Sequence, residues 1–543
     1  MKKTKQNVIV GALVGSAGIF ITKLIGLLYT VPFSALVGDG NLAYYGYGYN
    51  VYSSLLNITM AGFPFAIAAL VSKYMMLKNY EAVQAIKRLS FYVMAVFGFI
   101  CMVALFAFAG PIAVYMTKTM PETAHITKAV LQIISLALFV VPVLGVYRGY
   151  LQGLKELNQY AFNQVLEQLA RVIIMLAGGY IAIYMFQAER IFGVYFAMFS
   201  TSIAALLATL HMYVLQKRVV PKELKQNFQI DPYKMKQLFR ELLKYAMPFM
   251  VVAFLGNSYG LIDMLVVQRC LVQYGIEPET AKVIYGFISV TVNKLTSIPM
   301  VVAPGFSLSI IPYITTSYIA NDMKTVAKSI TDCLAAAIFL VLPLSLVLLS
   351  LGTPIYAVMY GGENMLLGGS VLSWYSLDGL TSALAPVVTA IMMALSLRYA
   401  NVKNILLGVI VKAVSVVPLI LLLGYPGALL SSVLGTLTSI TLNLRSVHQA
   451  VPVQYRKLLQ LTSKIFLCLC STQLVFMLFS FLGLKVYDVS RMQGFLELAV
   501  IGIGGAAAYF ASAFYLHIPQ TIFHKSTEEL MAVVQRLIRR KRS

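Results

Sequence analysis

Residues 89–117 read LSFYVMAVFGFICMVALFAFAGPIAVYMT and contain no charged side chain. About 20 apolar residues suffice for a helix to cross the hydrocarbon layer of a membrane, so this stretch is long enough to span it. Near-continuous apolar runs also occupy 129–147, 333–351 and 404–424. Strands of a membrane barrel would alternate over about ten residues, and these runs do not. The sequence therefore predicts an all-α, polytopic membrane protein.

The composition agrees with this prediction. Of the 543 residues, 59% are hydrophobic and 11% are charged, whereas soluble domains carry about 25% charged residues. The first apolar run follows the basic segment Met1–Gln6, but it extends past Thr30 without a small-residue cleavage site, so we expect a retained first helix. The five cysteines show no metal-binding spacing, and motifs of nucleotide hydrolases, serine hydrolases and zinc proteases are absent. We therefore expect neither an enzyme nor a metal site.

Fourteen transmembrane helices are predicted, grouped as two six-helix lobes plus a terminal helix pair around a central cavity, as in many secondary transporters. The predicted spans are 8–36, 50–77, 89–117, 127–150, 160–185, 191–216, 243–268, 283–316, 326–351, 367–396, 403–424, 427–447, 460–484 and 495–518. The polar stretch Lys217–Lys244 separates the lobes. The predicted domains are an N-lobe (1–216), a basic cytoplasmic linker (217–242), a C-lobe (243–450), helices 13 and 14 (451–520) and a basic cytoplasmic tail (521–543).

The positive charges predict the orientation. With fourteen spans, both termini lie on the same side of the membrane. Most of the 42 Lys and Arg residues belong to the termini, loops and helix ends on that side. Because cytoplasmic loops collect positive charge, both termini are predicted to be cytoplasmic. The net charge of +22 then reflects topology and attraction to anionic membrane lipids, and no nucleic acid is expected as a partner.

Four cations inside the predicted spans are the most informative residues. A Lys or Arg at mid-span costs about 2.5–3.5 kcal/mol on insertion scales, so it needs a cavity, water or an ionic partner. Lys23 and Lys294 have no acidic residue within a helical turn. If both face one cavity, they form an anion site suited to phosphate or pyrophosphate. The alternative is pairing with an acid on a neighbouring helix.

The other two cations have different surroundings. Glu167 precedes Arg171 by four residues, a spacing that favours an ion pair on one helix face. Lys412 has no local partner, and Asp263 and Asp378 are intramembrane acids that could neutralise it. A coupling-cation site built on Asp263 is the alternative. A tyrosine cluster (Tyr44, Tyr45, Tyr47, Tyr49 and Tyr52) is expected at the outer membrane interface, where aromatic belts form.

Several motifs resemble one transporter superfamily. Residues 148–153 (RGYLQG) resemble the RGxxQG element of the polysaccharide-transport and SpoVB-like branch of the MOP superfamily. Residues 244–248 (KYAMP), followed by Asp263, look like the start of that branch's second lobe. Residues 294–299 (KLTSIP) and 22–26 (TKLIG) resemble basic elements of the eighth and first helices of MurJ-type lipid II flippases. The resemblance covers essentially the whole chain.

This resemblance implies a flippase that moves the undecaprenyl-pyrophosphate-linked peptidoglycan precursor, lipid II, across the bacterial cytoplasmic membrane by alternating access. Lys23 and Lys294 would hold the pyrophosphate. The further candidates are Arg148, Arg171, Ser297 and Tyr29 for substrate binding, and Asp263, Asp378 and Lys412 for ion coupling. No cofactor is expected, whereas a coupling cation (sodium or a proton) or the membrane potential stays open as the driving force. Cell-wall synthesis proteins are candidate partners.

The sequence also departs from the MurJ-type pattern. Such flippases carry further arginines on the first two helices, where this chain has Tyr29 and the uncharged stretch Val51–Ser72, and an acid where it has Ser297. Export of another polyprenyl-linked oligosaccharide, or a sporulation paralogue, is therefore an alternative. Others are a multidrug/cation antiporter, which Lys23 and Lys294 argue against, and a non-transporting scaffold for wall synthesis.

Overall fold

The structure is a computed structural model of the whole chain. It describes residues 21–22, 24–60, 62–118, 120–154, 156–219, 221–225, 232–301, 314–315, 317–318, 320–484, 486 and 489–523. Within these ranges the regular secondary structure is helical and contains no strand. The chain divides into two compact units, called unit 1 (Met1–Lys294 with Ile420–Gly424) and unit 2 (Leu295–Leu419 with Tyr425–Ser543).

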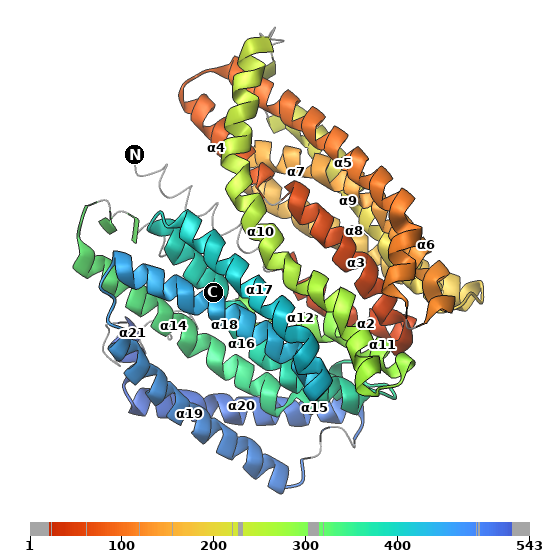
Figure 1. Cartoon of the computed structure of the whole chain (residues 1–543), viewed down its shortest axis with the longest axis vertical. Coiled ribbons are helices and arrows are strands. Elements are labelled where there is room, and N and C mark those ends of the chain that lie inside the picture. Colours follow the sequence, from red (N-terminus) through yellow and green to blue (C-terminus); the bar gives the residue numbers. More distant parts are fainter. Residues whose placement is uncertain are drawn as a thin grey trace, which may run out of the picture. The chain divides into compact units, whose positions relative to one another are not determined.

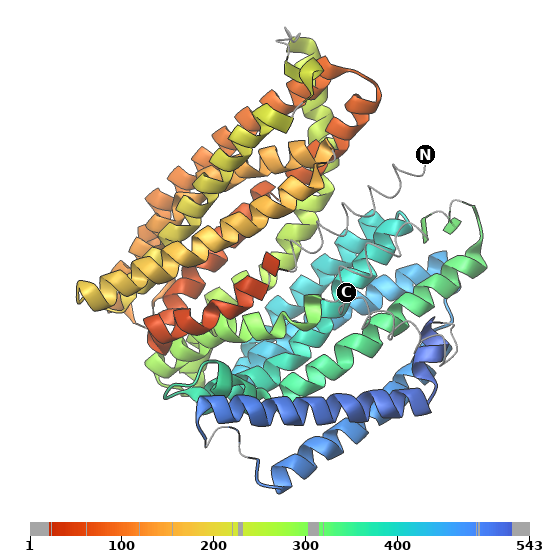
Figure 2. The ribbon, with the colours of Figure 1, turned by 180° about the vertical axis from the view of Figure 1, so that it is seen from behind.

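The main helices of unit 1 are α2 (Thr30–Val37), α3 (Asp39–Met60), α4 (Phe63–Met76), α5 (Tyr80–Met116), α6 (Ala124–Ser135), α7 (Ala137–Gly153), α8 (Leu157–Tyr180), α9 (Ile191–Val219), α10 (Pro232–Tyr274) and α11 (Pro278–Gly286) (Figure 1). Shorter helical segments are the 3₁₀-helices η1 (Pro121–Thr123) and η3 (Lys222–Lys225) and the π-helices η2 (Ile181–Met185) and η4 (Phe287–Thr291). Helix α12 (Val292–Thr296) crosses the boundary between the units. Helices α8 and α9 lie side by side (Figure 2).

Unit 2 begins with the turn η5 (Pro299–Val301). Its helices are α14 (Met323–Ser350), α15 (Gly352–Met359), α16 (Met365–Ala394), α17 (Arg398–Leu423), α18 (Tyr425–Ala450), α19 (Tyr455–Phe481), α20 (Arg491–Tyr515) and α21 (Ile518–Phe523). Helix α16 packs against α14 and α18, while α19 and α20 form a pair. Asn443 donates a hydrogen bond to Asn401 and accepts one from Asn404, both at 2.9 Å, so amide groups tie α17 to α18.

The predicted all-α membrane fold is confirmed. Among the described residues, eleven helices are long and apolar enough to span a membrane, and they coincide with eleven of the predicted spans. Two shorter apolar helices, Leu24–Val37 and Phe63–Met76, cover parts of the first two predicted spans. The predicted span 283–316 is described at residues 283–301 and 314–315, and it contains the end of α11 followed by η4, α12 and η5.

The second predicted span, 50–77, has the wrong bounds. Helix α3 begins earlier, at Asp39, and ends at Met60, while α4 starts at Phe63. Pro64 lies in the first turn of α4, where a residue without an N–H donor is tolerated, whereas a helix interior would lose a hydrogen bond. One apolar stretch therefore forms two helices.

The predicted lobes do not coincide with the two compact units. Helix α10 begins at Pro232, so the second part of the predicted linker is helical. Helix α10 packs against α3, α4 and α5, and α11 packs against α3, all within unit 1. The division of the chain into two six-helix lobes therefore stays a prediction. The predicted tail lies outside the described residues from 524 onward.

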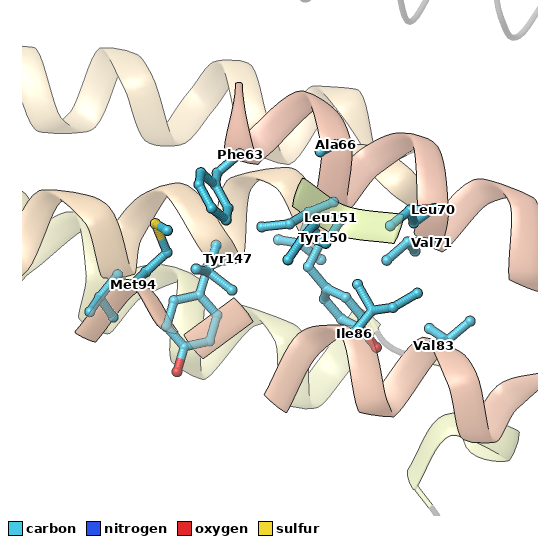
Figure 3. Close-up of a cluster of buried hydrophobic side chains, with 14 of the residues drawn as sticks. Phe63, Ala66, Leu70, Val71, Val83, Ile86, Met94, Tyr147, Tyr150 and Leu151 are labelled. Atoms are coloured by element: carbon cyan, nitrogen blue, oxygen red, sulfur yellow. The ribbon is translucent and has the colours of Figure 1, made fainter. Parts of the chain in front are cut away.

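Close packing of α7 on α4 forms the core of unit 1. Phe63, Ile67 and Leu70 of α4 meet Tyr150 and Leu151 of α7 in a buried cluster that also includes residues of α5, α9 and α10 (Figure 3). Because lipid tails are as apolar as these side chains, close van der Waals packing is what favours association inside a membrane.

Three glycines allow this close approach. Gly145, Gly149 and Gly153 lie four residues apart on one face of α7. A Cβ at Gly149 would lie 2.6 Å from the carbonyl oxygen of Pro64, and one at Gly153 would lie 2.6 Å from the Cβ of Val71. The two glycines of the RGYLQG motif therefore bring the backbones of α4 and α7 together.

Replacing Gly149 by Ala should destabilise unit 1. The added methyl group meets backbone atoms of α4, so the helices must separate, at a cost of about 1–3 kcal/mol for an overpacked site. The measurement is the apparent unfolding temperature of the detergent-purified protein, which should fall. Gly502→Ala is the matched control, because nothing lies within 4 Å of a Cβ at Gly502. Equal unfolding temperatures for the two variants would contradict the packing argument.

Candidate functional site

Lys294 lies beside an aromatic side chain from the start of the chain. Its Nζ atom is 5.8 Å from the centroid of the Tyr29 ring, within the range in which a cation is attracted to an aromatic face. Tyr29 is buried and directly precedes α2. The Tyr29 hydroxyl is 3.4 Å from that of Tyr45. A predicted intramembrane cation and a predicted substrate-binding tyrosine are thus neighbours in unit 1.

Tyrosines on one face of α3 continue this cluster. The rings of Tyr45 and Tyr49 stack at a centroid distance of 5.8 Å, and the ring of Tyr52 follows at 6.0 Å from that of Tyr49. Their spacing of four and three residues places them on one face of the helix. Tyr44, Tyr45, Tyr47 and Tyr52 are buried. These rings therefore pack against neighbouring helices within unit 1 and do not form a belt that faces lipid, and their position at the outer membrane interface stays a prediction.

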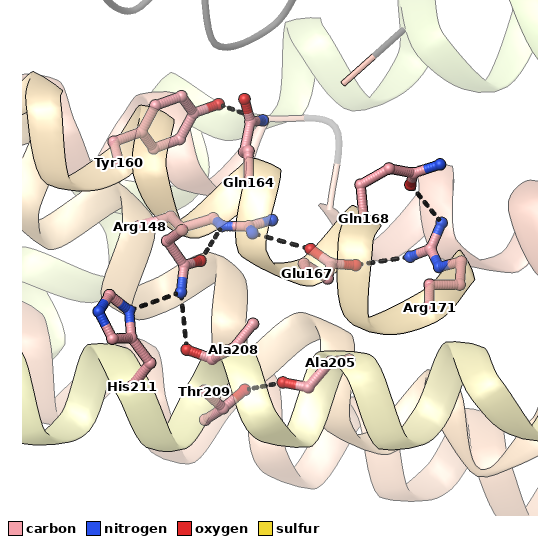
Figure 4. A network of polar contacts seen from close by, with 11 residues as sticks. Arg148, Tyr160, Gln164, Glu167, Gln168, Arg171, Ala205, Ala208, Thr209 and His211 are labelled. Atoms are coloured by element: carbon pink, nitrogen blue, oxygen red, sulfur yellow. Dashed lines mark hydrogen bonds and ion pairs between the residues drawn. The ribbon is translucent and has the colours of Figure 1, made fainter. Parts of the chain in front are cut away.

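Arg171, on α8, belongs to a network of charges that links α7, α8 and α9 (Figure 4). Arg171 Nη2 lies 2.5 Å from Glu167 Oε1, as the spacing predicts, and Arg148 Nη2 of α7 lies 2.7 Å from Glu167 Oε2. Arg148 Nε donates to Asn163 Oδ1 at 2.9 Å, and Asn163 Nδ2 donates to the carbonyl oxygen of Ala208 on α9 at 2.9 Å. The network therefore holds three helices in register.

The network leaves the charge of Arg171 incompletely balanced and one of its donors without a partner among the described residues. One carboxylate, Glu167, serves two guanidinium groups. The Nε atom of Arg171 is a buried donor that has no hydrogen-bond partner among the described residues. Leaving a buried donor unsatisfied costs about 1–3 kcal/mol, and more for a charged group. A ligand that accepts this hydrogen bond would remove that cost.

Arg171 and Lys294 lie near the same tyrosines. Arg171 lies within electrostatic range of the Tyr29 and Tyr49 hydroxyl groups, and so does Lys294. The two cations also interact with each other. Unit 1 thus brings together two positive charges and a group of hydroxyls, an arrangement that suits the oxygens of a phosphate or pyrophosphate.

The remaining predicted substrate-binding residues are placed differently. Lys23 lies outside the described residues, although its neighbours Thr22 and Leu24 are helical. Arg148 shares the Glu167 carboxylate with Arg171, and it also donates a hydrogen bond to Asn163. Ser297 follows α12 in unit 2, and its carbonyl oxygen accepts a hydrogen bond from the Met300 N–H.

The three predicted ion-coupling residues lie in different units. Asp263 belongs to α10 in unit 1 and interacts electrostatically with Tyr285. Asp378 on α16 and Lys412 on α17 belong to unit 2. Lys412 is completely buried and donates a hydrogen bond to Ser432 of α18. Within the described ranges, no three His, Cys, Asp or Glu side chains gather in a group that could hold a metal ion.

A polar seam between α3 and its neighbours was missed by the sequence analysis. Asn50 donates to the Tyr285 hydroxyl at 2.9 Å, and Asn257 of α10 donates to Ser54 at 2.5 Å. Asn50 and Ser54 lie four residues apart on α3, a spacing that marks one helix face and could have signalled the seam. Asp263 lies at this seam, since it interacts with Tyr285.

Comparison with known proteins gives consistent relatives. A family profile described as "Polysaccharide biosynthesis protein" matches residues 8–318. The chain is 28% identical to the lipid II flippase MurJ of Bacillus subtilis (strain 168), over 94% of this chain and 96% of the relative. It is 23% identical to stage V sporulation protein B of the same organism, over 83% and 86%.

Solved structures show the same fold. A structure of the lipid II flippase MurJ in an inward closed conformation matches with a TM-score of 0.68 at 14% identity, covering 93% of this chain and 99% of that one. An inward-facing multidrug-resistance MATE transporter of the MOP superfamily matches with a TM-score of 0.67 at 12% identity, covering 79% and 94%. The chain therefore shares the fold of these two transporters.

Removing the charge of Glu167 should destabilise unit 1 strongly. Glu167→Gln leaves two partly buried guanidinium groups without a counter-charge. Removing one partner of a fully buried ion pair costs about 3–5 kcal/mol, which sets the upper limit for this variant. The apparent unfolding temperature in detergent should fall well below that of the wild type.

Glu81→Gln is the matched control, because Glu81 pairs with the exposed Lys234 at 3.3 Å and a surface pair contributes only about 0–1 kcal/mol. If the two variants unfold at the same temperature, Glu167 does not hold the network together.

Proposed function

We propose that this chain, which belongs to the polysaccharide biosynthesis protein family, is a flippase for lipid II, the undecaprenyl-pyrophosphate-linked peptidoglycan precursor. The observation that carries the proposal is the convergence of Lys294 and Arg171 on the tyrosine cluster of unit 1. The similarity to a lipid II flippase over 94% of the chain supports it.

The site residues would act on the substrate by binding and orienting its pyrophosphate. Lys294 supplies an ammonium group beside Tyr29, and Arg171 supplies the Nε–H donor that the network leaves unsatisfied. Charge-assisted hydrogen bonds of this kind are about twice as strong as neutral ones. Lys23, whose predicted role is the same, would add a third cation from the first helix. The protein makes and breaks no covalent bond in this process.

The direction of transport follows from the proposed topology. Both termini lie in the cytoplasm, and the substrate enters from the cytoplasmic leaflet of the bacterial membrane. Alternating access then requires the two lobes to expose the cationic site first to one side and then to the other. Cell-wall synthesis proteins, which use the substrate, are the proposed partners.

A second candidate is export of another polyprenyl-linked oligosaccharide. The similarity to stage V sporulation protein B over 83% of the chain favours it, as do Tyr29 and Ser297 at positions where MurJ-type flippases carry charges. A polyprenyl pyrophosphate is shared by both substrates, so the same cations would serve. A multidrug/cation antiporter is disfavoured, because Lys294 and Arg171 would repel a cationic drug.

Replacing Lys294 by Ala, or Arg171 by Gln, should abolish or sharply reduce function. Each change removes a charge-assisted contact worth about 1.5–3 kcal/mol, which corresponds to a ten- to hundredfold loss of substrate affinity. The measurement is growth of a bacterium depleted of its own lipid II flippase, with each variant expressed at the wild-type level.

Lys118→Ala is the matched control for this assay. Lys118 also lies over a tyrosine, with Nζ 4.9 Å from the Tyr115 ring, but it is exposed, so the variant should support growth. Full growth of the Lys294 and Arg171 variants would contradict the anion site. Failure of the wild type to support growth would instead favour the other oligosaccharide.

We further propose that Asp263 couples transport to a cation, sodium or a proton. Asp263→Asn should remove the dependence of transport on a sodium gradient, a pH gradient or the membrane potential, because the carboxylate that binds the cation is gone. Transport of fluorescent lipid II in proteoliposomes measures this. Glu363→Gln, which removes an exposed carboxylate just before α16 in unit 2, is the control. An Asp263→Asn variant with unchanged ion dependence would exclude Asp263 from coupling.

A further inference from the structure

A cavity in unit 2 lies apart from the residues discussed above. It has a volume of about 790 Å³ and is lined by α14, α19, α21 and the turn before α19. These three helices contact one another, and Figure 1 shows α21 beside the first half of α14. Small-molecule sites in proteins usually measure 300–1,000 Å³, so the cavity is large enough to hold a ligand.

The lining of the cavity changes from charged to apolar along α14. Lys324 and Lys328 lie one turn apart on this helix and are exposed. Thr331 and Asp332 follow at the next turn, and the lining ends at the buried Ala335. Since residues four apart share a face of a helix, this face carries its charges at one end and its apolar side chains at the other.

Helix α19 repeats the same gradient. Gln454 and the exposed Lys457 line the cavity near the start of the helix, and Leu458 and Leu461 line it further along. Because α14 begins at Met323 and α19 at Tyr455, Lys324 and Lys457 belong to first turns, and Lys328 belongs to the second turn of α14. The N-terminal ends of helices carry a partial positive charge that favours anions, and this adds to the charge of the lysines.

The far end of the cavity is closed by the apolar core of unit 2. Ala335, Leu461 and Ile522 belong both to the cavity lining and to a buried cluster with Phe339 and Tyr509. The Tyr509 hydroxyl donates to the carbonyl oxygen of Phe339 at 2.6 Å and so satisfies its own polar group within that core. The inner part of the cavity therefore offers hydrocarbon contacts.

This combination selects the class of ligand. The lining carries three lysines and one carboxylate, that of Asp332, so its charged end has an excess of positive charge and attracts an anion. A free inorganic anion would gain nothing from the leucines, and a neutral hydrocarbon would gain nothing from the lysines. A molecule with an anionic head and an aliphatic chain uses both ends. In a membrane, anionic phospholipids have this form, and basic pockets between helices bind their head groups.

We propose that this cavity binds an anionic phospholipid of the surrounding membrane. The phosphate lies among Lys324, Lys328 and Lys457, and one acyl chain runs over Leu458 and Leu461. The site is separate from the proposed pyrophosphate site in unit 1, so the inference does not depend on the proposed function. A bound lipid would fill the space between α14 and the terminal helix pair.

The test is the binding of phosphatidylglycerol to the full-length protein in detergent, measured by native mass spectrometry. Replacing Lys324, Lys328 and Lys457 together by Gln should weaken binding about a hundredfold, because each lysine near an anionic lipid contributes about fivefold. Phosphatidylcholine should bind the wild type far more weakly. Ala327→Phe, which narrows the cavity and keeps every charge, should also weaken the binding of phosphatidylglycerol.

The control removes the same charge elsewhere in unit 2. Arg398, Lys403 and Arg456 are exposed and do not line the cavity, so their joint replacement by Gln should leave binding nearly unchanged. Equal losses in both triple variants, or none in either, would overturn the proposal. So would equal binding of phosphatidylcholine, or binding of inorganic phosphate as tight as that of phosphatidylglycerol, since the acyl chain would then contribute nothing.

Discussion

One carboxylate, that of Glu167, serves two arginines inside a helical bundle, and the arrangement of unit 1 depends on it. Ions removed from water need both a partner and further hydrogen bonds. Glu167 meets the first need for Arg148 and Arg171, and Asn163 ties Arg148 to α9. Because one negative charge cannot balance two positive ones, the network fixes α7, α8 and α9 and still leaves a cationic centre at Arg171.

Helix α3 connects that centre to the rest of unit 1. Its tyrosine face, with Tyr45 and Tyr49, turns toward the cations, and its amide face, with Asn50, contacts the helices that carry Asp263 and Tyr285. A helix with two polar faces cannot face lipid, because unsatisfied polar groups are costly there. The helix therefore lies in the interior of unit 1, and a substrate bound at the tyrosines would be close to Asp263, the residue of unit 1 proposed for ion coupling.

Much of this architecture could be predicted from the sequence, and the failures share a cause. Long apolar runs without charges correctly predicted the long membrane-spanning helices. The four-residue spacing of Glu167 and Arg171 correctly predicted their ion pair. Hydropathy gave the wrong bounds for α3, because its tyrosines and asparagines count as polar. In the structure their polar groups form hydrogen bonds with neighbouring helices. Contacts between distant residues, such as Arg148 with Glu167 or Tyr29 with Lys294, leave no periodic signal in one sequence.

The central claim is that Lys294 and Arg171 together recognise a pyrophosphate. The most direct measurement compares the binding of undecaprenyl pyrophosphate and undecaprenol to the purified protein in lipid nanodiscs. The wild type should strongly prefer the pyrophosphate, and the Lys294→Gln, Arg171→Gln double variant should lose that preference. This variant should stay folded, because Glu167 keeps Arg148 as its partner. An unchanged preference in the double variant would contradict the account.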